Sequence, residues 1–312
     1  MKIDNKKVDM FYDLVDEACM TYYHDIKRDY LEGFISFTEA LYEGVNESIL
    51  SIEATEKLER IINDINKHEF LNEEIRLAVE LVLIKGYKHK NMNLDFLTPD
   101  AICYIFSYLI NTMVKASYKE LIGSDKKLIV LDTVIGAGNM LQTVINNSEV
   151  NVLGIGIEKD ELFARLATAV SMIIDNEVIV NCNDAKEANP NLADIIIGDF
   201  GENSDIYDII ISRLNNIKGN GYFAYLINND FFAKADPKFR EKLLKEATLM
   251  GLIVLPSGFV SGNHVGKSIL VGKKEVLTDF QMSVINIDDL SEDSMIKVIY
   301  KINKMFNING GN

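Results

Sequence analysis

Apolar side chains recur at helical spacing through the first part of the chain. One helix face is traced by Val8, Phe11, Tyr12, Val15, Ala18, Cys19 and Tyr22, and another by Ile75, Ala78, Val79 and Val82. The second stretch follows Asn72, whose side chain can cap a helix that opens with two glutamates. Residues 1–90 are therefore predicted to form an α-helical N-terminal domain.

Beyond a turn-rich stretch at residues 85–95, the pattern changes. Thr98-Pro99-Asp100 opens one more apolar helix, because proline suits a first helical turn, where its missing N–H would have no partner. From Lys127 onward, stretches of helical spacing alternate with short apolar runs at 128–132, 152–158, 178–182, 194–198 and 221–227. Runs this apolar are typical of strands buried on both faces, which predicts a parallel sheet with helices on either side.

The last two apolar runs are arranged differently. Residues 252–256 and 268–272 are joined by a loop around 257–263, which is too short to contain a crossover helix, so the two strands must pair antiparallel. A mostly parallel seven-stranded sheet with an antiparallel closing strand is the methyltransferase variant of the doubly wound fold. We therefore predict an α/β, Rossmann-like class I methyltransferase domain over residues 91–312, preceded by the helical domain.

The acidic charge of the chain narrows its possible partners. Among 312 residues, 47 acidic against 32 basic side chains give a formal charge of -15, and no long basic block stands out. Such a balance repels a phosphate backbone, so bulk duplex DNA is a disfavoured partner.

Metal binding and membrane insertion are also disfavoured by the sequence. The three cysteines and four histidines form neither a CxxC nor an HxxxH pair, so no metal site is expected. The first residues place acids inside their apolar stretch, unlike a signal peptide, and the apolar runs are of strand length. We expect a cytoplasmic protein.

A glycine turn follows the first predicted strand. Leu128–Asp132 ends in a carboxylate, and Gly136-Ala137-Gly138-Asn139 comes directly afterwards. A Gly-x-Gly turn lets the backbone approach a ligand closely, and the N–H groups of the helix that follows point at that ligand.

Acidic residues follow the next three strands as well. Glu158 can accept hydrogen bonds from both hydroxyls of a ribose, and Asp184 can accept one from an adenine amino group, while Asp199 follows the fourth strand. An NAD site usually has a third glycine where this chain has Leu141, and it rarely needs an acid after the third strand. This arrangement favours S-adenosylmethionine (SAM) as the cofactor over NAD, and disfavours an NAD-dependent oxidoreductase.

The order of these motifs resembles that of amino-directed, adenine-specific (N6) DNA methyltransferases of the type found in restriction-modification M subunits. The matching segments are Thr98-Pro99, Leu131-Asp132, Gly136–Asn139, Glu158, Asp184-Ala185 and Asp194–Asp199, with Leu255–Phe259 and Lys267–Val271 resembling the closing hairpin. The resemblance runs from about residue 90 to 275. A helical N-terminal domain without a target-recognition domain is most similar to the small YtxK-like branch.

The resemblance implies a role for each matching residue. Thr98 and Pro99 line the methionine end of SAM, and Asp132 with the turn of Gly136, Gly138 and Asn139 holds the amino-acid moiety. The remaining contacts come from Glu158 to the ribose, from Asp184 with Ala185 to the adenine, and from Asp199 beside the reacting end.

The chain departs from the family where methyl transfer takes place. An Asn/Asp-Pro-Pro-Tyr/Phe loop orients the flipped base in these enzymes, whereas the aligned residues here are Asp199-Phe200-Gly201-Glu202. Asp199 keeps an acceptor, and Phe200 or Tyr207 can supply stacking only from altered positions. Thr133 and Val134 also replace the usual proline and small residue after Asp132.

Two functional hypotheses follow. The first is a SAM-dependent methyltransferase acting on an amino nitrogen, with Asp199 and Phe200 as the candidate catalytic residues and a nucleic acid such as tRNA, a protein or a small amine as acceptor. The second is a catalytically silent SAM-binding protein that acts through protein partners, which the loss of both prolines favours.

Overall fold

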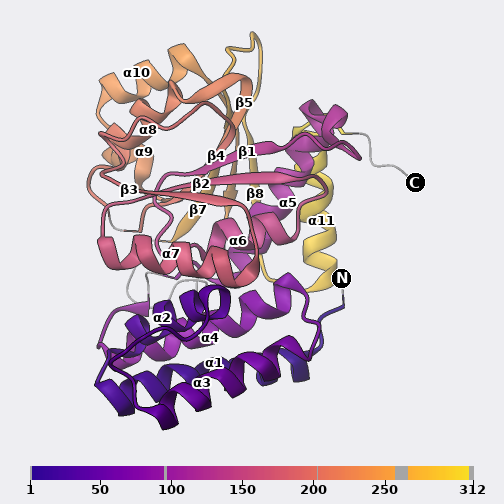
Figure 1. Cartoon of the computed structure of the whole chain (residues 1–312). Coiled ribbons are helices and arrows are strands. Elements are labelled where there is room, and N and C mark those ends of the chain that lie inside the picture. Colours follow the sequence, from indigo (N-terminus) through magenta and orange to yellow (C-terminus); the bar gives the residue numbers. More distant parts are fainter. Residues whose placement is uncertain (1, 95–96, 202, 257–265, 309–312) are drawn as a thin grey trace.

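Four helices form the N-terminal layer, at the bottom of the molecule in Figure 1. A computed structural model of the chain describes residues 2–94, 97–201, 203–256 and 266–308. The four helices are α1 (Asn5–Ile26), α2 (Tyr30–Glu43), α3 (Ile52–Asn66) and α4 (Asn72–His89). At the start of α4 the backbone N–H of Leu71 donates to the Glu74 carboxylate at 2.9 Å. The cap that the sequence assigned to the Asn72 side chain is therefore supplied by Glu74.

A single sheet of eight strands lies above this layer, in the order β3-β2-β1-β4-β5-β7-β6-β8. The strands are β1 (Leu128–Asp132), β2 (Val152–Glu158), β3 (Val178–Cys182), β4 (Ala193–Asp199), β5 (Ile217–Asn228), β6 (Thr248–Val254), β7 (Lys267–Lys273) and β8 (Ser283–Asn286). β7 pairs antiparallel with both β5 and β6, and the other pairs are parallel. The predicted α/β fold and its antiparallel closing strand are confirmed.

The eighth strand is an addition to the predicted seven. β8 pairs parallel with β6 and forms an edge of the sheet. It has only four residues, and just one of them is buried. The run is too short and too polar to stand out as a strand in the sequence.

Helices cover both faces of the sheet (Figure 1). On the face toward the N-terminal layer lie α5 (Asp100–Ser117), α6 (Asn139–Asn146), α7 (Glu161–Ile174) and α11 (Glu292–Met305), with the short 3-10 helix η2 (Lys119–Leu121) after α5. On the opposite face lie α8 (Ile206–Leu214), α9 (Phe231–Lys234) and α10 (Pro237–Glu246). Among the described residues, no helix is long and apolar enough to cross a membrane.

The N-terminal layer shares an apolar core with the sheet-covering helix α7. Tyr87 and Leu31 of the N-terminal layer belong to the same buried cluster as Phe163 and Leu166 of α7. Ala137, in the middle of the glycine turn, belongs to this cluster too and is 2% exposed. The helices encoded first in the chain therefore cover the turn after β1.

Candidate functional site

The turn after β1 has the backbone geometry that its glycines predict. Gly136 and Gly138 have φ angles of 55° and 96°, a region that side chains on Cβ disfavour. α6 begins directly afterwards at Asn139, so the first N–H groups of the helix lie beside the turn.

Glu158 is tied to this turn at the end of β2. Its carboxylate accepts hydrogen bonds from the backbone N–H of Gly136 at 3.0 Å and from that of Asp160 at 2.9 Å. The side chain is buried, and each of its oxygens keeps capacity for a further donor. The ends of β1 and β2 are thereby held in one arrangement.

Asp132 lies almost completely buried at the end of β1, with 1% of its surface exposed. Burial, with a smaller contribution from the nearby carboxylates Asp199 and Glu158, raises the pKa of this carboxyl to about 7, although a hydrogen bond from the Val134 N–H at 3.1 Å opposes the shift. A cationic group placed beside Asp132 would favour its ionised form.

The end of β3 borders a small cavity that also touches the first two strand ends. Asp184 is partly buried and accepts a hydrogen bond from the Lys186 N–H at 2.8 Å, and Ala185 is 9% exposed. The cavity encloses about 40 Å³ and is lined by Thr133, Val134, Ile157, Glu158, Lys159, Asn183, Asp184, Ala185, Asn203, Asp205 and Ile209. Cofactor pockets usually measure about 300–1,000 Å³. The cavity in this structure is smaller than that range.

A larger cleft lies away from the strand ends. It encloses about 210 Å³ between α2, α7 and β3, and its lining includes Glu39, Arg165 and Cys182. Only Cys182 marks the end of a strand, and none of the acids predicted to bind a cofactor lines this cleft.

Asp199, at the end of β4, is the meeting point of three segments. The Thr98 hydroxyl donates to its carboxylate at 2.9 Å, and the Gly201 N–H donates at 3.1 Å. The ammonium of Lys267, at the start of β7, lies 3.6 Å from the same carboxylate. The sequence analysis assigned no role to Lys267. Its position at the start of the closing strand, opposite the end of β5, could have indicated that it lies near the site.

The two aromatic side chains that could stack on an acceptor are both packed elsewhere. Phe200 is 4% exposed, and its ring lies 5.4 Å from that of Tyr225 in the core under α8 and α9. Tyr207 stacks on Phe231 with ring centroids 4.8 Å apart, and its hydroxyl donates to the Phe231 carbonyl. Glu202 lies outside the described residues.

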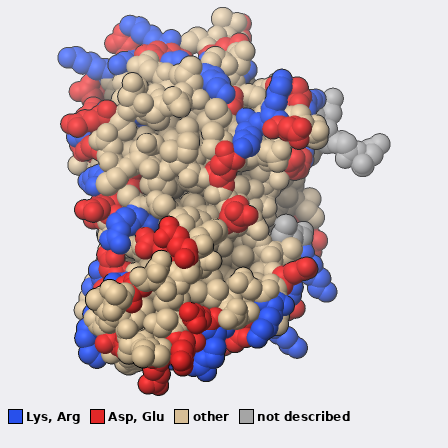
Figure 2. All heavy atoms as spheres, viewed as in Figure 1, with Lys and Arg blue, Asp and Glu red and all other residues tan. Residues whose placement is uncertain are grey.

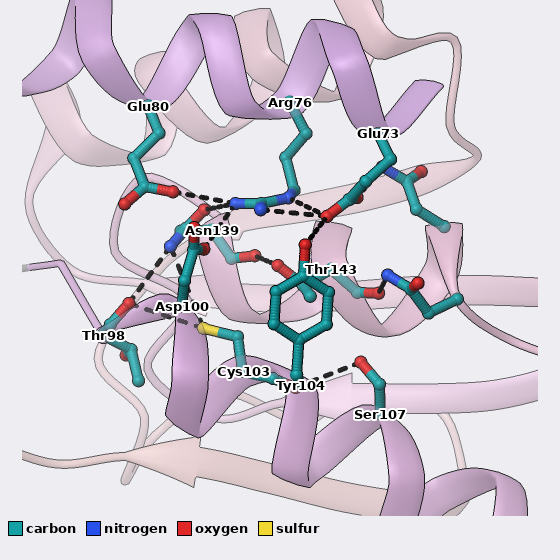
Figure 3. A network of polar contacts seen from close by, with 12 residues as sticks. Glu73, Arg76, Glu80, Thr98, Asp100, Cys103, Tyr104, Ser107, Asn139 and Thr143 are labelled. Carbon is teal, nitrogen blue, oxygen red and sulfur yellow. Dashed lines mark hydrogen bonds and ion pairs between the residues drawn. The ribbon is translucent and has the colours of Figure 1, made fainter. Parts of the chain in front are cut away.

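Arg76 of α4 reaches the site from the N-terminal layer, and sequence reasoning missed it (Figure 3). Its guanidinium is 1% exposed and donates to the Asn139 side-chain oxygen at 2.6 Å. Three carboxylates surround it, namely Glu73, Glu80 and Asp100, each with an oxygen 2.9 Å from a guanidinium nitrogen. Its spacing to Glu73 and Glu80 is also that of an ordinary exposed helical ion pair, so nothing in the local pattern indicated that Arg76 would be buried.

Comparison with known proteins supports the same fold and the same branch. Residues 9–87 match the family model of the YtxK N-terminal helical domain. The uncharacterized protein YtxK of Bacillus subtilis is 24% identical over 271 residues, which are 78% of this chain and 80% of that protein. The resemblance to the YtxK-like branch is thereby confirmed.

Solved structures of other proteins have a similar fold. A putative class I SAM-dependent methyltransferase from Listeria monocytogenes superposes with a TM-score of 0.82 at 22% identity, covering 97% of this chain and all of the other. The methyltransferase subunit of a type I restriction-modification system from Streptococcus thermophilus gives a TM-score of 0.62 at 13% identity, covering 95% and 74% of the two chains. The chain has the class I SAM-dependent methyltransferase fold with a helical N-terminal domain.

Proposed function

We propose that this chain binds SAM at the carboxyl ends of β1 to β4 and transfers its methyl group to an amino nitrogen held by Asp199. The main observation behind this proposal is that Asp132, Glu158 and Asp199 lie close together beside one glycine turn. This is the edge of the sheet at which doubly wound folds bind ligands. The solved structures with this fold include a putative class I SAM-dependent methyltransferase.

The acceptors present fit the polar groups of SAM. Asp132 suits the methionine ammonium, Glu158 the ribose hydroxyls and Asp184 the adenine amino group. A further observation supports the ribose position: Tyr87 of α4 is fully buried, and its hydroxyl has no hydrogen-bond partner among the described residues. Burial raises the pKa of Tyr87, and the negative charge of Glu158 contributes to the increase, so this unpaired hydroxyl is close enough to interact with the carboxylate that we propose for the ribose.

Asp199 suits the orientation of the acceptor. Bound SAM supplies an electrophilic sulfonium methyl group, and transfer depends mainly on aligning the nucleophile with it. The Asp199 carboxylate is 12% exposed and is fixed by Thr98 and Gly201, so a remaining lone pair can accept a hydrogen bond from an amino group. Lys267 offsets the charge that this carboxylate carries.

The second candidate is a SAM-binding protein that transfers no methyl group and acts through protein partners. The burial of Phe200 against Tyr225 favours it, because no aromatic ring then remains in the loop to stack on a flipped base. The same observation favours a small or flexible amine over a nucleobase if transfer occurs.

The surface charge bears on the acceptor class. Lysines and arginines lie among aspartates and glutamates over the N-terminal layer, as Figure 2 shows for one face. With a formal charge of -15, the chain is a poor partner for bulk duplex DNA, whereas a protein, a tRNA or a small amine stays open as acceptor.

Calorimetry with SAM and its demethylated product, followed by a radiolabelled-methyl screen against DNA, RNA and lysate protein, tests the proposal. We expect binding of both ligands and labelling of one pool that Asp199→Ala abolishes. Asp230→Ala is the matched control, because that aspartate lies at the start of α9 and pairs with Lys234.

Each outcome separates the candidates. Absence of binding at millimolar SAM would refute the proposed cofactor. Binding without transfer to any pool supports the silent protein, and transfer that survives Asp199→Ala removes the role of Asp199.

A further inference from the structure

We infer that Arg76, on the N-terminal helix α4, is a positioning residue for the methionine end of the cofactor. The inference rests on the SAM binding proposed above. It extends the proposed binding site into the N-terminal helical layer, in which the sequence analysis identified no cofactor-binding residue.

A continuous series of hydrogen bonds runs from Arg76 to Asp199, and Figure 3 shows its first part, from Arg76 through Asn139 to Thr98. The Arg76 guanidinium donates to the Asn139 oxygen at 2.6 Å, and the Asn139 amide nitrogen donates to the Thr98 carbonyl at 3.1 Å. The Thr98 hydroxyl then donates to Asp199 at 2.9 Å. The two segments proposed to hold the methionine moiety, the start of α6 and Thr98, are therefore tied together by the amide that Arg76 fixes.

The amide of Asn139 has a defined orientation because of Arg76. A guanidinium has only donors, so the atom that faces it must be the amide oxygen, which leaves the amide nitrogen for Thr98. Without Arg76 the amide could rotate, and the contact to Thr98 would no longer be enforced. Asn139 is also 6% exposed, so water has little access to replace the lost donor.

The surroundings of Arg76 hold it rigidly. Glu73 accepts from Nε at 3.0 Å, while Glu80 and Asp100 lie on the other side of the planar guanidinium. Burial and the Asp100 carboxylate together raise the pKa of Glu80 to about 7 although Arg76 opposes the shift, so this acid retains a proton more readily than an exposed glutamate. A planar fork can face acceptors on two sides at once, and an ammonium cannot.

A purely structural role is the competing explanation. Arg76 also joins α4 to α5, since Glu73 accepts both from Arg76 and from the Tyr104 hydroxyl at 2.7 Å. Loss of that linkage would loosen the packing of α4 without a preference for one end of the cofactor. The two explanations therefore differ in which part of the ligand loses affinity.

Calorimetry of Arg76→Met with two ligands separates these explanations. One ligand is SAM and the other is 5′-methylthioadenosine, which has the adenosine part and lacks the amino-acid part. We expect the affinity for SAM to fall on the order of tenfold or more, because the charge-assisted hydrogen bond that orients Asn139 is lost, while methylthioadenosine affinity changes less than about twofold. Far-ultraviolet circular dichroism and a thermal melt establish that the variant is folded.

Arg165→Met is the matched control. Arg165 of α7 pairs with Glu32 of α2 through two hydrogen bonds of 2.9 and 2.8 Å, so it also links the helical layer to the rest of the molecule. It is far more exposed than Arg76. Its two hydrogen bonds go to Glu32 and not to the residues of the hydrogen-bond series that links Arg76 to Asp199. We expect both affinities to stay unchanged in this variant.

Three results would overturn the inference. If the wild type binds neither ligand, the proposed function fails and the inference with it. If the wild type binds both and Arg76→Met loses both equally, or loses neither, the inference alone fails. Should Arg76→Met not fold, Arg76→Lys replaces it, because the charge is kept while the fork is lost, and the same selective loss of SAM affinity is required.

Discussion

Asp132 is a single buried carboxyl whose raised pKa makes the stability of the folded chain depend on pH. Its side chain is 1% exposed, and burial holds its pKa at about 7 in the folded chain. A carboxyl with a raised folded pKa keeps its proton longer than it does in the unfolded chain. The contribution of Asp132 to the free energy of unfolding therefore decreases as the pH rises from the ordinary pKa of an aspartate toward 7, and it is constant above pH 7.

The first prediction is that SAM affinity falls as the solution is acidified from pH 8 to pH 6. Only the ionised Asp132 can balance the methionine ammonium, and at one unit below its pKa roughly a tenth of the population is ionised, so affinity should drop roughly tenfold. Calorimetry at several pH values measures this. Asp132→Asn should bind SAM weakly with a flatter pH profile, and an equally steep profile in that variant would exclude Asp132 as the cause.

Individual residues also mark where sequence reasoning succeeded and where it could not. The turn at Gly136 and the carboxylate of Glu158 were predicted because a local pattern, a strand end followed by a characteristic residue, encodes them. The burial of Arg76 was not, because the residues that enclose it, Asp100 and Asn139, come from other elements. The packing of Phe200 on Tyr225 depends in the same way on a contact between β4's end and β5.

At the scale of elements, the close approach of neighbouring strands depends on missing side chains. Gly272 of β7 lies opposite Phe223 of β5, and the aromatic ring covers the glycine. A Cβ atom at Gly272 would lie 2.0 Å from the nearest ring carbon. Because the ring itself is completely buried, it has no free space into which it can move.

The second prediction is that Gly272→Ala lowers the free energy of unfolding by about 1–3 kcal/mol, since the added methyl group overpacks the β5–β7 contact. Gly219→Ala is the matched control on β5, where an added Cβ has no atom within 4 Å, and it should change stability by less than about 0.5 kcal/mol. Urea unfolding followed by circular dichroism compares the two. Equal stabilities would show that the ring shifts freely.

The relative direction of the strands was the most predictable property at this scale. The antiparallel pairing of β6 with β7 followed from the length of the loop between them, and the parallel strands followed from their continuous apolar runs. β8 escaped prediction because four residues with one buried side chain carry no clear period.

For the whole molecule, the helical layer and the sheet are joined by more than a linker. Buried residues of α1 to α4 form one cluster with α7 and with Ala137 of the glycine turn, and Arg76 adds a buried polar contact to α6. The predicted boundary near residue 90 stays a prediction about the chain's domains. The shared core implies that neither side of that boundary keeps its apolar surface covered when the other unfolds.

The third prediction is therefore a single cooperative unfolding transition. Hydrogen exchange measured by mass spectrometry in increasing urea should give the same opening free energy for peptides of α1 to α4 and of β1 to β5. If the helical peptides lost protection at lower urea while the strands stayed protected, the shared cluster would contribute little, and two independently stable domains would be indicated.

The burial of Phe200 also bears on whether this loop can be exchanged for a different one. A proline at that position, as in the base-stacking loop of adenine methyltransferases, would remove a buried ring that packs on Tyr225. Losing a buried phenylalanine costs about 3–5 kcal/mol, a large part of the 5–15 kcal/mol that typically separates folded from unfolded chains. Replacing this loop by the proline-containing one, without other changes, would therefore produce a poorly folded chain. Installing that loop by design would first require compensating substitutions around Tyr225.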